Sequence, residues 1–169
     1  YPQIKIVAKS GSLYSTITSA QNSITDAASN KIYTVLVLPG EYDEALTLKD
    51  YVNIVAIDPF NTYILRQVTD GGIAVHCNLK INIDNRQTDG THGLYLKAAS
   101  VIKIDGNIKG SDKPEGVGGV GGAGIYNEAA GIITVLNNDI KAGTVLHFGS
   151  CGIYNGAAGE ITVINGNVT

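Results

Sequence analysis

Short runs in which hydrophobic and polar residues alternate fill most of the second half of the chain. Ile133, Thr134 and Val135 form one such run, and residues 161–163 (ITV) form another. Each run covers three to five residues before Gly, Asn or a pair of Ala interrupts it. A period of two with frequent turn residues is typical of β-strands, whereas helices repeat at three and four. We therefore expect short strands joined by tight turns, with Ile133 and Val135 facing the core.

These runs belong to a repeated unit. The pattern GIYN-x-AAG-x-ITV starts at Gly124 and again at Gly152, 28 residues later. A more divergent copy starts at Gly93, 31 residues before Gly124, and a fourth, shorter copy is expected to start at Gly72. The residues that lengthen the spacing from 28 to 31 fall in 110–123, a Gly-rich stretch that predicts a surface loop. Constant strands separated by loops of varying length indicate a solenoid.

Two or three short strands per repeat predict an all-β fold, and specifically a right-handed parallel β-helix whose coils stack on one another. Stacking would align equivalent residues of successive copies in columns. One column is expected to contain Tyr95, Tyr126 and Tyr154. A second, at a turn where Asn tolerates left-handed backbone, is expected to contain Asp105, Asn137 and Asn165. The tyrosine column has two interpretations, a platform that binds sugar rings or a stack that only stabilises the coils.

The N-terminal part follows a different pattern. Ile17, Ala20, Ile24 and Ala27 recur at helical spacing, which predicts a helix over residues 14–28. Strands are expected to follow at 33–38, 46–48 and 52–57. A helix in the region 13–30 would cap the open end of the coils at 31–169, so residues 1–169 form one domain. Because the chain starts without Met and ends within a repeat, we expect a mature product or a piece of a longer protein.

The first coils resemble a known superfamily. After the predicted helix and first strand comes PGEYDE at residues 39–44, followed by LTL at 46–48 and VNIV at 52–55. This order resembles the opening coils of the pectin-lyase-like superfamily, which includes pectin methylesterases and phage tailspike or appendage proteins. The likeness covers roughly residues 13–65 as a motif. It implies a right-handed parallel β-helix, but no particular activity, because one fold hosts many functions.

Enzymes with this fold act on polysaccharides, so the resemblance directs attention to their catalytic motifs. The stretch 143–149 (GTVLHFG) is similar to the pectin methylesterase motif but has Leu146 where the nucleophilic Asp stands. Residues 85–92 (NRQTDGTH) resemble only the first part of a polygalacturonase site. The calcium-binding Asp cluster and Arg motif of pectate lyases are not recognisable. His147, beside Phe148, is interpreted as a packed or surface residue rather than as a base.

A different acidic site remains conceivable on adjacent coils. The wider candidates are Asp70, His76, Asp84, Arg86, Asp89 and His92. Asp84, Asp89 and His92 are the catalytic candidates, because a glycosidase needs two carboxyl groups about 5–10 Å apart. The competing interpretation, and the more common one for acids on successive coils, is a solvated or turn-forming face.

Charge and composition exclude several other classes. A net charge of -3 and a pI near 5.5 provide no basic surface, so we expect neither nucleic-acid binding nor membrane insertion. No metal or cofactor is expected, and residues 116–122 (GVGGVGG) lack the Lys-Ser/Thr end of a phosphate-binding loop. Cys77 and Cys151 are interpreted as small buried hydrophobic residues, and whether they pair stays open.

These observations favour a structural or adhesive module of a phage tailspike, an appendage or a cell-surface fibre. Its expected partners are further copies of itself, as a homo-oligomer or an end-to-end assembly, and a polysaccharide. Its expected location is extracellular, on a cell surface or on a virion. The alternative is a polysaccharide-degrading enzyme, or a fragment of one, with the catalytic candidates above. An ice-binding surface is disfavoured because the chain has no regular Thr-x-Thr ladder.

Overall fold

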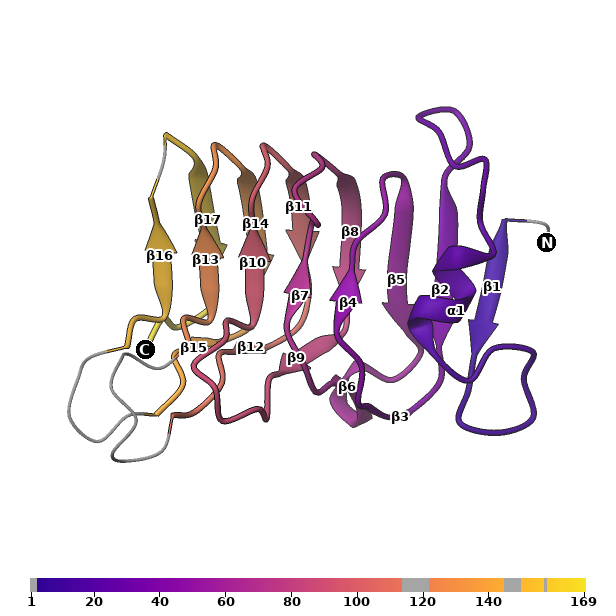
Figure 1. Cartoon of the computed structure of the whole chain (residues 1–169), viewed down its shortest axis with the longest axis horizontal. Coiled ribbons are helices and arrows are strands. Elements are labelled where there is room, and N and C mark those ends of the chain that lie inside the picture. The colour runs from indigo at the N-terminus through magenta and orange to yellow at the C-terminus, as the bar shows by residue number, and fades with distance from the viewer. Residues whose placement is uncertain (1–2, 114–121, 145–149, 157) are drawn as a thin grey trace.

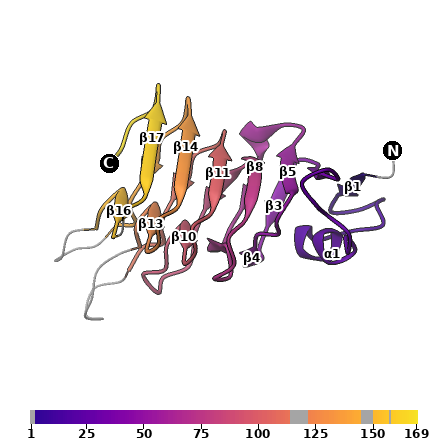
Figure 2. The same cartoon turned by 90° about the horizontal axis from the view of Figure 1, so that it is seen from above.

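The computed structural model describes residues 3–113, 122–144, 150–156 and 158–169, and it is a right-handed parallel β-helix (Figures 1 and 2). The described strands cycle through three parallel sheets, so each coil contributes one strand to each sheet. The first sheet contains β1 (Ile4–Val7), β2 (Tyr33–Val37), β5 (Val52–Ala56), β8 (His76–Lys80), β11 (Val101–Ile104), β14 (Ile132–Leu136) and β17 (Glu160–Ile164). This result confirms the fold class predicted from the repeat.

The other two sheets complete the coils. The second contains β4 (Leu46–Thr47), β7 (Val68–Thr69), β10 (Leu94–Leu96), β13 (Ile125–Asn127) and β16 (Ile153–Asn155). The third contains β3 (Gly40–Tyr42), β6 (Thr62–Ile64), β9 (Asn82–Asp84), β12 (Ile108–Lys109) and β15 (Ile140–Lys141). A short 3-10 helix, η1 (Pro59–Asn61), precedes β6.

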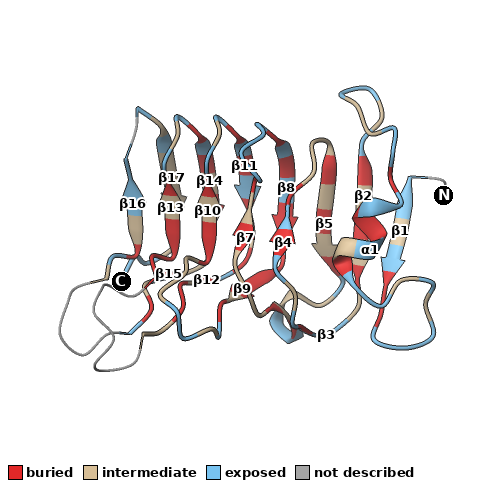
Figure 3. Cartoon of the chain, in the orientation of Figure 1, coloured by how far each residue is buried: buried red, intermediate tan, exposed pale blue. Residues whose placement is uncertain are grey.

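Register places equivalent residues of successive copies in contact, as the repeat predicted. Ile102 pairs with Ile133, which pairs with Ile161, and Ile104 continues through Val135 in the same way. Ile102, Ile104, Ile133 and Val135 are all buried, and Figure 3 shows buried positions alternating with exposed ones along these strands. Each coil therefore buries its apolar residues against its neighbours, which is how a solenoid forms a core.

The N-terminal helix is shorter than predicted. Helix α1 covers Ile17–Asn22, whereas the helical spacing predicted 14–28. Ser23 ends it, and its hydroxyl donates to the carbonyl of Ala20. Ile24 is buried without being helical, because the chain leaves the helix and Lys49 donates to the Ile24 carbonyl. None of the helices in the described residues is long and apolar enough to cross a membrane.

Helix α1 packs against β1, β2 and β4 at the N-terminal end of the stack, so the predicted cap is confirmed. The glutamate of the PGEYDE segment holds the helix in place. Its carboxylate accepts hydrogen bonds from the backbone N–H groups of Ile17 (2.8 Å) and Thr18 (2.9 Å), and from the Thr18 hydroxyl (2.5 Å). Glu44 thus satisfies free donors at the start of the helix, where a negative charge is also favoured.

Strand β1, which the sequence analysis did not anticipate, forms the first edge of the seven-stranded sheet. The loop after it folds back on the C-terminal part of that edge. The Ser12 hydroxyl donates to the carbonyl of Ile6 (2.6 Å), and the Ala8 N–H donates to the carbonyl of Tyr14 (3.1 Å). Occupied backbone groups make this part of the edge a poor template for another strand.

The expected start of the fourth copy at Gly72 is wrong. Leu94 of β10 pairs with Val68 of β7, so the equivalent of Gly93 is Gln67. Gly71 and Gly72 have positive φ angles of 68° and 81°, and they form the turn that follows β7. The Gly residues that suggested a repeat start therefore serve a turn instead.

The second predicted column is partly wrong. Asn137 and Asn165 do stack in left-handed conformation, with φ of 53° and 56°, and the Asn165 amide donates to the Asn137 side chain (3.1 Å). Asp105 is not their equivalent, because Ile104 pairs with Val135 and the later turn has one more residue. Asp105 accepts a hydrogen bond from Asn138 instead (3.0 Å).

A longer ladder runs along the neighbouring position. In it, the side-chain oxygen of each residue accepts the backbone N–H of its equivalent in the next coil, at 3.0, 2.9 and 3.2 Å. Its members are Asn82, Asn107, Asp139 and Asn167. This ladder ties four successive coils together at one corner of the helix.

Candidate functional site

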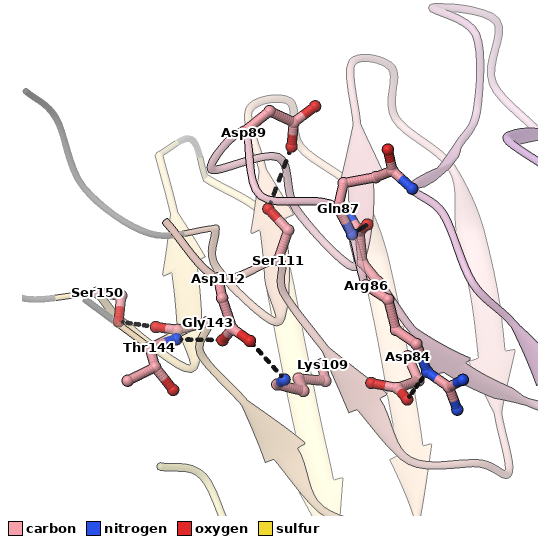
Figure 4. A network of polar contacts seen from close by, with 11 residues as sticks. Asp84, Arg86, Gln87, Asp89, Lys109, Ser111, Asp112, Gly143, Thr144 and Ser150 are labelled. Atoms are coloured by element: carbon pink, nitrogen blue, oxygen red, sulfur yellow. Dashed lines mark hydrogen bonds and ion pairs between the residues drawn. The ribbon is translucent and has the colours of Figure 1, made fainter. Parts of the chain in front are cut away.

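Asp84, Arg86 and Asp89 lie at the end of β9 and on the loop that connects it to β10 (Figure 4), and His92 lies on the same loop. Arg86 donates to Asp84 (2.8 Å) and pairs with Glu41 on β3, two coils earlier (2.8 Å). The Arg86 guanidinium thus holds one carboxylate on each side. Asp84 is engaged in this ion pair and does not face Asp89.

Asp89 organises the loop backbone. Its Oδ1 accepts hydrogen bonds from the Thr91 N–H (3.1 Å), the Thr91 hydroxyl (2.7 Å) and the Ser111 hydroxyl (3.3 Å). Partial burial opposes ionisation of this carboxyl, but these hydrogen bonds outweigh it, so the pKa of Asp89 is lowered. A glycosidase needs an acid whose pKa is raised so that it carries a proton. Asp89 is therefore unsuited to be the general acid, whereas an ionised carboxylate suits the base or nucleophile.

His92 is held between the loop and the tyrosine column. Its Nδ1 accepts the backbone N–H of Ala123 (3.1 Å), and its ring stacks on Tyr126 with centroids 4.2 Å apart and planes 19° apart. Burial lowers the pKa of His92, although Glu128 opposes the effect. The ring is therefore a neutral acceptor in the stack at neutral pH, with one nitrogen already used.

The remaining two candidates lie elsewhere. Asp70 occupies a core position after β7, and its carboxylate accepts from the N–H groups of Gly72, Lys97 and Ala98 at 2.9–3.1 Å, and from the Ser100 hydroxyl (2.9 Å). This fully satisfied carboxylate holds two turns together. His76 lies on β8 in the seven-stranded sheet, on a different side of the coil from β9 and β10.

The tyrosine column forms, but its rings cover one another. Tyr126 pairs with Tyr95 and Tyr154 in register. The Tyr126 and Tyr154 rings stack at 4.3 Å and 17°, whereas Tyr95 meets Tyr126 edge-on at 5.3 Å and 89°. With His92 on its other side, Tyr126 has both faces covered. A sugar needs an uncovered aromatic face, and within this stack the outer face of Tyr154 best meets that need.

Two charged residues that sequence reasoning missed complete the cluster. The Tyr95 hydroxyl donates to Glu128 (2.6 Å), a hydrogen bond that raises the pKa of Tyr95 to about 12. The Lys97 amine lies 4.9 Å from the centre of the Tyr95 ring. Glu128 stands two residues after Tyr126, and Lys97 two after Tyr95, so the period of two along these strands was the signal that could have found them.

A second polar network lies next to the loop of Asp89 (Figure 4). Asp112 accepts from the Thr144 N–H (2.7 Å) and pairs with Lys109 (3.2 Å), while the Ser150 hydroxyl donates to the Gly143 carbonyl (2.5 Å). These contacts tie the described ends of two loops together. Within residues 3–113, 122–144, 150–156 and 158–169, no group of three or more His, Cys, Asp or Glu is placed to hold a metal ion.

Several candidates fall where the structure describes no residues. Leu146, His147 and Phe148 lie outside the described residues, as does most of the Gly-rich stretch 116–122. Both cysteines are described, and both are free. Cys77 is buried, which raises the pKa of its thiol to about 12, whereas Cys151 is exposed. The interpretation as buried hydrophobic residues therefore holds for Cys77 and is wrong for Cys151.

The chain has a similar solved structure but no detectable relative by sequence. No protein-family model matches the chain, and no curated protein matches it. Among solved structures, the chain is similar to pectin methylesterase PemA from Erwinia chrysanthemi, at 12% sequence identity and a TM-score of 0.45. The match covers 81% of this chain and 42% of that chain, so the chain spans less than half of the enzyme's length. The architecture is the right-handed parallel β-helix that the sequence resemblance implied.

Proposed function

We propose that this chain is a structural and adhesive module, a β-helical rod of a tailspike, appendage or surface fibre that acts outside the cell or on a virion and contacts carbohydrate. The observation that carries the proposal is that the candidate catalytic acids are already engaged in structural hydrogen bonds or in an ion pair. Asp70 and Asp89 accept hydrogen bonds from backbone and hydroxyl groups, and Asp84 is paired with Arg86. A rod whose coils repeat the same side-chain positions suits contact with a repeating polymer.

Binding and cleavage of polysaccharides test this function together. The protein is applied to an array of linear neutral and uronate-containing oligosaccharides, and the bound glycans are then incubated with it and analysed for shorter products. We expect binding without cleavage. Absence of binding to every glycan on the array would contradict the adhesive function.

The second candidate function is polysaccharide degradation. It is favoured by one observation: Asp84, Asp89 and His92 all lie at the end of β9 or on the loop between β9 and β10, and Asp89 contacts Ser111 of the next coil. Cleavage of polygalacturonate or of another arrayed glycan would support it, provided that Asp89→Asn abolishes the activity. Retention of the fold in Asp89→Asn must be shown by its circular dichroism spectrum, because Asp89 also holds the loop.

Self-association is part of the proposed function. The last described coil exposes apolar side chains, with Tyr154, Ile164 and Val168 each between 42% and 47% exposed. The opposite end carries α1 and a loop that occupies part of the β1 edge, so we propose association between like C-terminal coils rather than head-to-tail stacking. Sedimentation velocity tests this proposal. A monomer at all protein concentrations, or an oligomer unaffected by Ile164→Lys, would contradict it.

A further inference from the structure

The outer face of the seven-stranded sheet carries a groove of about 280 Å³, on a different side of the coils from the tyrosine column. Register lays its lining residues in two rows along the long axis of the molecule. Tyr51 stacks on His76, which pairs with Val101 and, through it, with Ile132. Two residues further along each strand lie Asn53, Asn78, Lys103 and Thr134. The groove thus has one aromatic and aliphatic row and one polar row.

The aliphatic residues of the groove are exposed. Val101 is 40% exposed and Ile132 48%, and Ile32, which precedes β2 at the Tyr51 end of the groove, is 49% exposed. The polar row offers amide, amine and hydroxyl groups. The Asn78 amide already donates to Asn53 (3.2 Å), and no ion pair described here involves Lys103. Apolar surface beside a few ordered polar groups is the usual composition of a ligand site.

Tyr51 supplies an independent indication of function. It has φ of 57°, in the left-handed region that large side chains avoid, whereas the other two non-Gly residues described with positive φ are asparagines. Backbone hydrogen bonds to the neighbouring coils fix this conformation. The Tyr51 N–H donates to the His76 carbonyl (3.1 Å), and the Tyr51 carbonyl accepts from the Tyr33 N–H (3.0 Å). Strained residues that the surrounding structure holds in place cluster at binding sites.

Asp50 holds His76, whose ring stacks on the Tyr51 ring. Its carboxylate accepts the backbone N–H of His76 (2.7 Å) and lies 3.2 Å from the imidazole Nδ1. The His76 ring is parallel to Tyr51 within 8°, at 5.6 Å between centroids. The start of the groove is therefore an ordered aromatic pair, in which the stacked faces are covered and a ligand meets the outer face or the edge of the Tyr51 ring with little loss of side-chain freedom.

We propose that this groove binds a linear polysaccharide along the axis of the β-helix, with the C–H faces of the sugars on the aromatic and aliphatic row and their hydroxyl or carboxylate groups on the polar row. Adjacent strands lie about 4.8 Å apart, which is close to the length of one pyranose unit. The strands β5, β8, β11 and β14 therefore present positions in register to successive sugars. The proposal rests on the adhesive function above and assigns its contact surface.

Tyr51→Asn is the decisive variant, because Asn accepts left-handed backbone and removes only the ring. On the glycan array, we expect affinity to fall roughly tenfold, the loss typical of an aromatic anchor, while the melting temperature stays equal or rises. Lys103→Gln should weaken binding of uronate-containing glycans more than that of neutral ones. Single sugars should bind far more weakly than chains that span the groove.

Tyr63→Asn, on β6 in the third sheet, is the matched control and should leave binding unchanged. If Tyr51→Asn binds like the original protein while Tyr154→Ala loses binding, the groove is overturned as the site and the adhesive function stands. If no arrayed glycan binds the original protein, both are overturned. A fall in melting temperature of Tyr51→Asn, with unchanged binding, would show that the ring is structural.

Discussion

At the scale of single residues, Glu44 makes a contribution that can be measured. The Glu44 carboxylate accepts three hydrogen bonds from Ile17 and Thr18. Replacing Glu44 with Gln keeps the shape of the side chain but removes its negative charge and one of the two acceptor oxygens. We expect a loss of about 1–3 kcal/mol in the free energy of unfolding, measured by urea titration. Glu41→Gln is the control, since its exposed ion pair with Arg86 is worth little. Equal losses in the two variants would refute the capping role.

His92 gives the protein a predictable pH dependence. Burial lowers its pKa in the folded state, so the unfolded chain binds the proton first as the pH falls below about 6.5. The stability associated with His92 is therefore complete above the unfolded pKa and decreases as the pH falls toward the folded pKa. We expect His92→Gln to show a smaller decrease in urea midpoint between pH 7 and pH 5 than the original protein. An identical decrease would mean that other groups cause it.

At the scale of the elements, close approach between coils explains why each clear copy begins with Gly. A Cβ atom on Gly124 would lie 2.6 Å from the Ile140 side chain and 2.8 Å from the Gly152 carbonyl oxygen. We expect Gly124→Ala to cost about 1–3 kcal/mol, measured as a lower urea midpoint. The control is Gly156→Ala, where the atoms nearest to a Cβ belong to the exposed Tyr154 ring. The preceding copy already has Glu128 at that position, so the control should be nearly neutral.

The elements also show what the sequence could predict. The strands of the copies at Gly93, Gly124 and Gly152 were predictable because one pattern of strand and turn residues recurs in them. The copy before them was misplaced, because Gln67 stands where the later copies have Gly and a turn supplies Gly71 and Gly72 instead. Helical spacing extended α1 too far, since burial of Ile24 by packing imitates helical periodicity.

The site was predictable only where it follows the register of the strands. Tyr95, Tyr126 and Tyr154 align because each copy places Tyr two residues after its Gly. The entry of His92 into that stack depends on the path of a loop, which no period encodes. The left-handed backbone of Tyr51 was equally unpredictable, because the residue type opposes it and long-range hydrogen bonds impose it.

At the scale of the whole molecule, stability should vary along the axis, because each coil of a solenoid contacts only its neighbours. The first coil is covered by α1, while in the described structure β17 contacts only β14 within its sheet. Apolar burial confirms the difference: Val35 and Ile54 are fully buried, whereas Ile161 and Val163 are only partly buried. Local opening should therefore start at β16 and β17.

Hydrogen exchange read by mass spectrometry measures this gradient directly. In dilute protein, we expect the amides of β17 to exchange fastest among the strands of the seven-stranded sheet and those of β5 and β8 slowest, because opening β17 breaks one strand interface and opening an inner strand breaks two. If C-terminal coils associate, protection of β17 should rise with protein concentration while that of β5 stays constant. Ile164→Lys should remove the rise and leave the dilute profile unchanged. Uniform protection along the axis at every concentration would show that the stack opens as one unit, which would contradict the nearest-neighbour description of its stability.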